Sequence, residues 1–145
     1  MAGFSEAELE AMKQRAAELK ADADSGVTGA KKRTRDEEAL LAAIEELSGS
    51  DKDIAERIHA IIISEAPELH ARTWYGFPAY AGDDGNVIIF LQPTAKFGTR
   101  YCTLGFNDNA QLDQNHMWPT SYAIIDINDK VEASVRGLVR RAVGK

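Results

Sequence analysis

The sequence predicts an α+β fold in which helices pack on an antiparallel sheet of about four to five strands. Over the first 70 residues, apolar side chains recur at steps of three and four, which is the period of an amphipathic helix. From residue 71 onward, β-branched and aromatic residues form short runs between turn signals, and a last helical stretch follows. This order of elements predicts a two-layer arrangement of helices on a sheet, in a single domain.

The first helix is predicted over residues 1–20. Ser5 and Glu8 have the spacing of a capping box, and the residues after them have a helical apolar period. Residues 21–33 contain two glycines and, apart from Val27, no large apolar side chain. We therefore expect a flexible connector there, with the basic run 31–35 as solvated linker.

Two more helices are predicted before the strands. Thr34 with Glu37 forms a second capping box, and Ser50 caps a third helix. Pro67 disfavours helical backbone at Ala66, so the third helix should end there. The expected buried positions are Leu40, Leu41, Ile44 and Leu47 in one helix and Ile54, Ile58, Ile61 and Ile62 in the other.

Four strands are predicted, over residues 73–80, 86–92, 97–106 and 121–127, followed by a closing helix. The second strand has five consecutive apolar residues, which is typical of a central strand covered on both faces. The Asp-Gly turn before it joins it to the first strand as a hairpin. Pro78 lacks an N–H group, so the first strand should lie at an edge or bend.

The aromatic residues of 73–80 divide between two faces if this segment is one strand. Alternation then places Trp74 and Tyr80 on one face and Tyr75 and Phe77 on the other. Because two of the strands are apolar on both faces, either something covers the side of the sheet away from the main helices or that side is an exposed hydrophobic surface. The first helix is the expected lid.

Charge and composition exclude several classes of partner. The net charge is −6, and the first 70 residues alone carry −7, so the protein should repel nucleic acid. No apolar run approaches the roughly 20 residues of a membrane helix, and the start has no signal-like segment, so a cytoplasmic location is expected. The single cysteine, Cys102, is expected to be buried rather than reactive.

Three segments closely resemble the YdhG-like bacterial domains of unknown function: TWYGFPAYAGDDGNVIIFLQPTAKFGTRYCTLGFND, LDQNHMWPTSYAI and VRGLVRRAV. The resemblance extends over nearly the whole chain and implies a YdhG-like domain at 34–145, related in fold to frataxins and YjbR-type proteins. It transfers no catalytic residue. Some members are described as frataxin-like iron chaperones, which implies Fe(II) binding by surface carboxylates. Glu6, Glu8 and Glu10 fit that pattern, whereas the strand 73–80 has no carboxylate.

No enzyme motif is present in the sequence. It has neither a nucleophile elbow nor a phosphate-binding glycine loop, and its three histidines lack the four-residue spacing of helical metal ligands. Asp108, Asp113 and His116 share one loop and could bind a hard cation, although loop acids commonly cap turns. No cofactor is expected, except iron under the chaperone alternative.

Non-catalytic binding is therefore the predicted function, either of a small ligand in a cleft between the sheet and the first helix or of a protein partner. Aromatic side chains with one or two cations at the rim suit a planar or anionic ligand. The candidate residues are Trp74, Tyr80, Lys96, Arg100, Tyr101 and Trp118. In the competing interpretation, the tryptophans are core residues and Arg100 pairs with a helix carboxylate.

Overall fold

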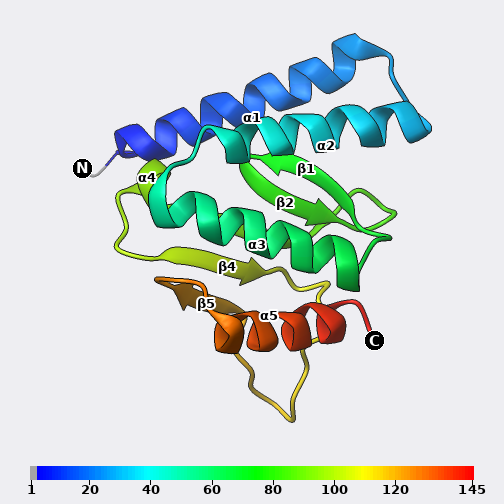
Figure 1. Cartoon of the computed structure of the whole chain (residues 1–145). Helices are drawn as coiled ribbons and strands as arrows, with labels where there is room; N and C mark the ends of the chain where they lie inside the picture. Colours follow the sequence, from blue (N-terminus) through cyan, green and yellow to red (C-terminus); the bar gives the residue numbers. More distant parts are fainter. Residues whose placement is uncertain (1–2) are drawn as a thin grey trace.

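The five strands form one antiparallel meander in the order β1-β2-β3-β4-β5 (Figure 1). This computed structural model describes residues 3–145 and confirms the predicted α+β class. The strands are β1 His70–Trp74, β2 Phe77–Ala81, β3 Val87–Gln92, β4 Cys102–Phe106 and β5 Ser121–Ile124. The helices are α1 Glu6–Ser25, α2 Gly29–Glu45, α3 Gly49–Glu65, α4 Thr94–Phe97 and α5 Asp129–Ala142. None of the described helices is long and apolar enough to cross a membrane.

The core lies between one face of the sheet and the helices α2, α3 and α5 (Figure 1). In β3, Ile89 and Leu91 are fully buried against the helices, whereas Ile88, Phe90 and Gln92 on the opposite face are only half-buried. The helices contribute the buried residues Leu40, Ile44, Ile54, Ile58, Ile61, Ile62, Val135 and Val139. Burial of these apolar side chains is the main contribution to folding. The opposite face of the sheet, which we call the far face, remains partly open.

The segment 73–80 is a hairpin and not one strand. Tyr75 and Gly76 both have positive φ, 54° and 83°, as a two-residue type I′ turn requires, and Trp74 pairs with Phe77 across it. The prediction that Trp74 and Tyr80 share a face is therefore wrong, because the turn interrupts the alternation. Tyr80 points toward the helices, is fully buried, and lies with its hydroxyl 2.9 Å from Nδ1 of His59.

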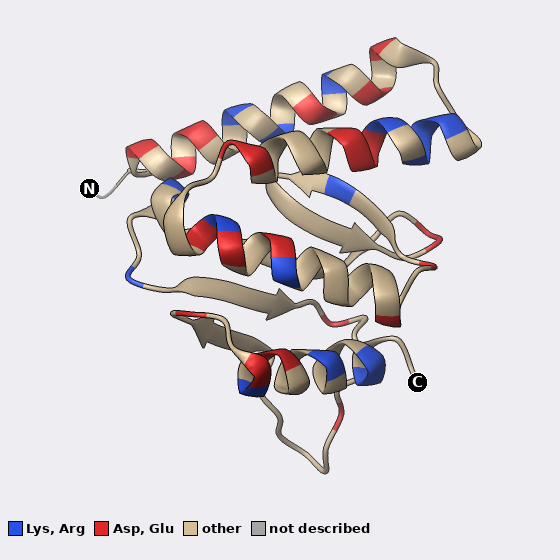
Figure 2. Ribbon diagram, viewed as in Figure 1, with Lys and Arg blue, Asp and Glu red and all other residues tan. Residues whose placement is uncertain are grey.

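The connector expected over residues 21–33 is mostly helix. α1 continues to Ser25 and ends at Gly26 in the left-handed conformation, and α2 begins at Gly29, so only residues 26–28 join them. The basic run 31–35 belongs to the first turns of α2, beside acidic residues of α1 (Figure 2). Lys32 and Arg35 both bond to Asp22 of α1, which joins the two antiparallel helices.

The strand predicted over 97–106 begins only at Cys102, and the short helix α4 precedes it. Asp51, in the first turn of α3, accepts hydrogen bonds from the backbone of Thr94 (3.2 Å) and Ala95 (3.0 Å) and from the Thr94 hydroxyl (2.7 Å). Burial opposes ionisation of Asp51, but these hydrogen bonds outweigh it and hold the pKa of the carboxyl below its usual range. α4 is thus attached to the α3 side of the core by a buried carboxylate.

Candidate functional site

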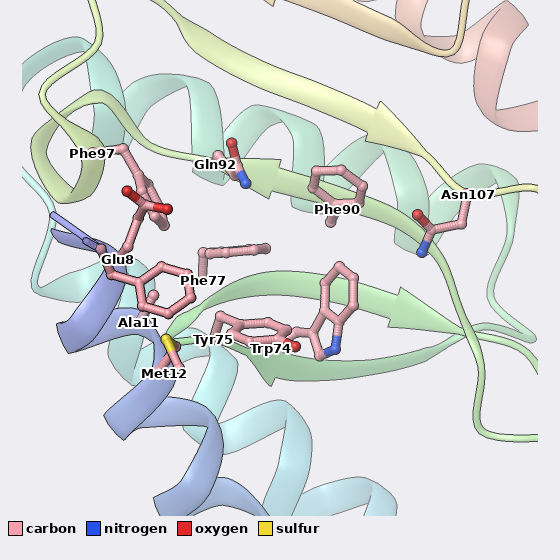
Figure 3. Close-up of a pocket in the computed structure, with 11 residues that line it drawn as sticks. Glu8, Ala11, Met12, Trp74, Tyr75, Phe77, Phe90, Gln92, Phe97 and Asn107 are labelled. Atoms are coloured by element: carbon pink, nitrogen blue, oxygen red, sulfur yellow. The ribbon is translucent and has the colours of Figure 1, made fainter. Parts of the chain in front are cut away.

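A pocket of about 330 Å³ lies between the first turns of α1 and the far face of the sheet (Figure 3). We call it the α1–sheet pocket. Its apolar lining comprises Phe4, Ala11, Met12, Trp74, Tyr75, Phe77, Phe90 and Phe97, and its polar lining comprises Glu8, Gln92 and Asn107. The lining comes from α1 and the segment before it, the β1–β2 hairpin, β3, α4 and the loop that follows β4. The pocket is therefore walled by elements that are far apart in the sequence.

The sheet side of the pocket is a cluster of aromatic rings in contact with one another. The centre of the Trp74 ring lies 5.1 Å from the ring centre of Tyr75, 5.9 Å from that of Phe77 and 5.5 Å from that of Phe90. Phe97 of α4 meets Phe77 edge-on at 5.9 Å. Edge-to-face and tilted pairs of this kind are favourable beyond simple burial, and they fix each ring against its neighbours.

The Phe90 ring occupies the space beside its partner across the ladder, which is a glycine. Phe90 pairs with Gly105 of β4, and a Cβ atom built on Gly105 would fall 2.1 Å from Cζ of the Phe90 ring. No other residue leaves room for the ring in this position. Gly105 therefore sets the depth of the pocket at its sheet side.

α1 is held against the hairpin turn by one carboxylate. Glu18 accepts hydrogen bonds from the backbone N–H groups of Tyr75 (3.1 Å) and Gly76 (3.0 Å), and it pairs with Arg15 at 3.2 Å. These bonds place the preceding turns of α1, with Ala11 and Met12, over the aromatic cluster. The first helix thus covers part of the far face and leaves the α1–sheet pocket open.

Only one of the six predicted ligand-binding residues, Trp74, lines the pocket. Lys96 lies close by, with Nζ 3.1 Å from the position that a Cβ atom on Gly76 would take. Tyr80 lies on the opposite face of the sheet. The Arg100 guanidinium lies over the Tyr101 ring at 5.4 Å, outside the pocket.

Trp118 packs against the main core, which agrees with the competing interpretation of that residue. The other lining residues of the pocket were not predicted to bind a small ligand, and Glu8 was predicted only as a metal ligand. Phe90 could have been found, since the alternation of β3 places it opposite Ile89 and Leu91. Phe97 could not, because α4 has no clear sequence signal.

Among residues 3–145, the predicted acidic residues do not belong to a group of three or more His, Cys, Asp or Glu side chains that could hold a metal ion. No group of three or more His, Cys, Asp or Glu side chains that could hold a metal ion is present among residues 3–145. Glu8 lines the pocket and also caps α1, since its carboxylate accepts the Ser5 N–H at 3.1 Å. Asp108, Asp113 and His116 are likewise not brought together as such a group.

Two side chains with nucleophilic or basic groups, Cys102 and His59, lie away from the pocket. Cys102 is buried, and burial together with its hydrogen bond to Asp51 (3.3 Å) raises the pKa of the thiol to about 12. Burial lowers the pKa of His59, which favours its neutral form. Neither residue lines the α1–sheet pocket.

Comparison of the chain with models of protein families, with curated proteins and with solved structures gives no match. The arrangement of side chains in the pocket is therefore the basis for a functional interpretation.

Proposed function

We propose that this protein binds a small molecule with a planar, apolar body in the α1–sheet pocket and does not catalyse a reaction on it. The observation that carries the proposal is the composition of the pocket wall. Six aromatic side chains line it, against three residues with amide or carboxylate groups. A concave apolar site with a few polar groups is the usual form of a small-molecule site in proteins.

The size and rigidity of the pocket support a small ligand over a protein partner. Its volume of about 330 Å³ lies near the lower end of the range for ligand sites, about 300–1,000 Å³. The sheet side of the wall is held in place before a ligand arrives, because Glu18 holds α1 on the hairpin, Asp51 holds α4 and Gly105 leaves room for the Phe90 ring. In a preformed site, little conformational entropy of the side chains is lost when the ligand binds.

Phe4 and Met12 provide a means of closing the site. Both line the pocket, yet 62% of Phe4 and 46% of Met12 is exposed to solvent. Apolar side chains at the rim gain burial when a ligand fills the space beneath them, so the bound state is stabilised further.

We propose that the assignment to the YdhG-like domains also holds. A ferrous-iron carrier using Glu6, Glu8 and Glu10 stays the alternative, without a structural observation that favours it.

A neutral aromatic probe tests the proposal. Isothermal titration of the full chain with 2-naphthamide should give saturable binding at one site. Ala11→Leu places extra methyl groups in the pocket and should weaken binding by about tenfold or more. Ala16→Leu is the matched control, since Ala16 is exposed on the same helix and does not line the pocket. Absence of binding, or equal affinity of the two variants, would contradict the proposal.

A further inference from the structure

A second, polar pocket adjoins the α1–sheet pocket on the far face of the sheet. It has a volume of about 520 Å³ and shares Trp74 and Asn107 with the first pocket. Its lining comprises Arg15, Arg72, Trp74, Gly85, Asn86, Val87, Asn107, Asp108 and Asn109. Figure 3 shows Trp74 and Asn107 at the end of the α1–sheet pocket that is away from Phe97. The two pockets are therefore neighbours across the Trp74 side chain.

The same two elements supply an apolar wall to the first pocket and an arginine to the second. On α1, Arg15 follows Ala11 by four residues and so lies one turn further along the same helix face. On β1, Arg72 precedes Trp74 by two residues and so points to the same face of the sheet. A ligand that extended from the aromatic rings past Trp74 would enter the pocket that Arg15 and Arg72 line.

Arg72 is exceptional in the sheet. It is the only Asp, Glu, Lys or Arg in the five described strands (Figure 2). Its side chain is only 15% exposed, and that of Arg15 is 21% exposed. A charged group held on a largely covered surface loses hydration, which favours an anionic partner for it.

Neither guanidinium is fully used by the protein. Arg15 makes its bond to Glu18 through one nitrogen, and Arg72 donates from Nε to the carbonyl of Thr73 at 3.3 Å. Arg72 also forms a long ion pair with Asp22, whose Oδ2 lies 3.8 Å from Nη2 of the guanidinium. Because each guanidinium has five N–H donors, several stay available for a planar carboxylate, which they can bind in a bidentate manner. Asp108 is the one acidic residue that lines the polar pocket, against two arginines.

We propose that the ligand is an aromatic carboxylate. Its planar body would occupy the α1–sheet pocket, and its carboxylate would reach past Trp74 to Arg15 and Arg72. This inference rests on the proposed function, since it requires the aromatic pocket to be a binding site. It adds the charge of the ligand and the two residues that recognise it.

A pair of probes that differ only in charge tests this inference. Titrations of the full chain with 2-naphthoate and with 2-naphthamide compare an anion with a neutral molecule of the same shape. We expect naphthoate to bind about tenfold more tightly, as hydrogen bonds to a charged group imply. Arg15→Gln and Arg72→Gln should each remove most of this preference and leave the affinity for naphthamide within about twofold. Arg100→Gln is the matched control, because Arg100 is exposed and lies outside both pockets.

Each outcome has a distinct meaning. Equal affinity of the wild-type protein for the two probes would overturn the inference and leave the proposed function in place. A preference for naphthoate that survives both arginine substitutions would also overturn it, since another group would then recognise the anion. If naphthamide does not bind, the proposed function fails, and the inference, which requires the aromatic pocket to be a binding site, fails with it. The affinity for naphthamide also reports whether a variant has kept its fold, so loss of structure cannot be mistaken for loss of recognition.

Discussion

The carboxylate of Glu18 accepts the backbone N–H of Tyr75 at 3.1 Å, so the type I′ turn of the β1–β2 hairpin is capped by a residue of α1, 57 positions earlier in the chain. The other carboxylate oxygen accepts the N–H of Gly76 at 3.0 Å. A turn of this kind leaves N–H groups unpaired, and one side chain here satisfies two of them. The same bonds fix the position of α1 above the aromatic cluster, so the shape of the pocket depends on them.

Glu18→Ala should loosen α1 and widen the pocket. Two backbone N–H groups lose their partner, so we expect the free energy of unfolding to fall by about 1–3 kcal/mol. Hydrogen exchange of α1 amides should accelerate more than exchange in α3. Glu10→Ala is the control, because Glu10 is exposed on the same helix and bonds only to Gln14. Exchange of α1 in Glu18→Ala at the wild-type rate would show that other contacts hold the helix.

Gly105→Ala should displace the Phe90 ring. The new methyl group would lie 2.1 Å from Cζ of Phe90, so the ring or the strand must move, at a cost of about 1–3 kcal/mol. The affinity for 2-naphthamide should fall with it, as measured by titration. Gly137→Ala is the control, and its effect on stability should have the opposite sign. Gly137 lies in the exposed middle of α5 with open space around it. It should stabilise the protein by about 0.5–1 kcal/mol.

A double substitution separates this clash from other effects of the alanine. Phe90→Ala removes the ring that the Gly105→Ala methyl group would meet, so the two changes together should destabilise the protein by less than their sum. Additive losses in thermal unfolding experiments would mean that Gly105 is required for another reason.

The fold class follows from periodicity, and so do most of the buried helix positions. The apolar steps of three and four correctly identified Leu40, Ile44, Ile54, Ile58 and Ile62 as core, whereas Leu41, which was also expected to be buried, is 45% exposed. The prediction from the sequence was wrong where one local pattern was compatible with two structures. Two glycines over 21–33 indicated a linker, yet Gly26 and Gly29 only end one helix and begin the next. A break of three residues between two helices cannot be told from a longer linker by composition.

The site was predicted less well than the fold because its geometry depends on one turn. Tyr75 at φ 54° is unusual for a residue with a side chain, so the sequence favoured a continuous strand over 73–80. The Glu18 carboxylate and the ring pairs of Trp74 stabilise that conformation through tertiary contacts. Contacts between residues this far apart are not visible in local sequence patterns. As a result Trp74 does line the pocket, whereas Tyr80 was placed on the wrong face of the sheet.

Cys102 should resist alkylation in the folded protein. Its thiol is buried, donates to Asp51, and has a pKa raised to about 12, so almost no thiolate forms near neutral pH. Labelling with iodoacetamide, followed by mass spectrometry, should be slow in buffer and fast in denaturant. Asp51→Asn should accelerate labelling under native conditions, because it disrupts the hydrogen bonds that hold α4 over this region. Rapid labelling of the folded wild-type protein would contradict the assigned environment.

The stability of the fold should decrease as the pH falls below about 6.5, because of His59. Burial lowers the pKa of His59, with a smaller opposing effect from Glu37. The unfolded chain then binds a proton at a pH where the folded chain does not, so acidification favours unfolding. The loss begins near the ordinary pKa of histidine and is complete once the pH is below the lowered pKa of the folded state. Asp36 and Asp51, whose pKa values are also lowered, contribute in the same direction only below about pH 4.

His59→Asn removes the titrating group and retains a polar atom near the Tyr80 hydroxyl, which His59 meets at 2.9 Å. Calorimetric melting temperatures measured from about pH 7.5 to about pH 5 should fall steeply for the wild-type protein and more gently for this variant. His116→Asn is the control, because His116 is exposed in the β4–β5 loop, and it should retain the wild-type dependence. Parallel curves for the wild-type protein and His59→Asn would mean that the histidine is not the group that titrates.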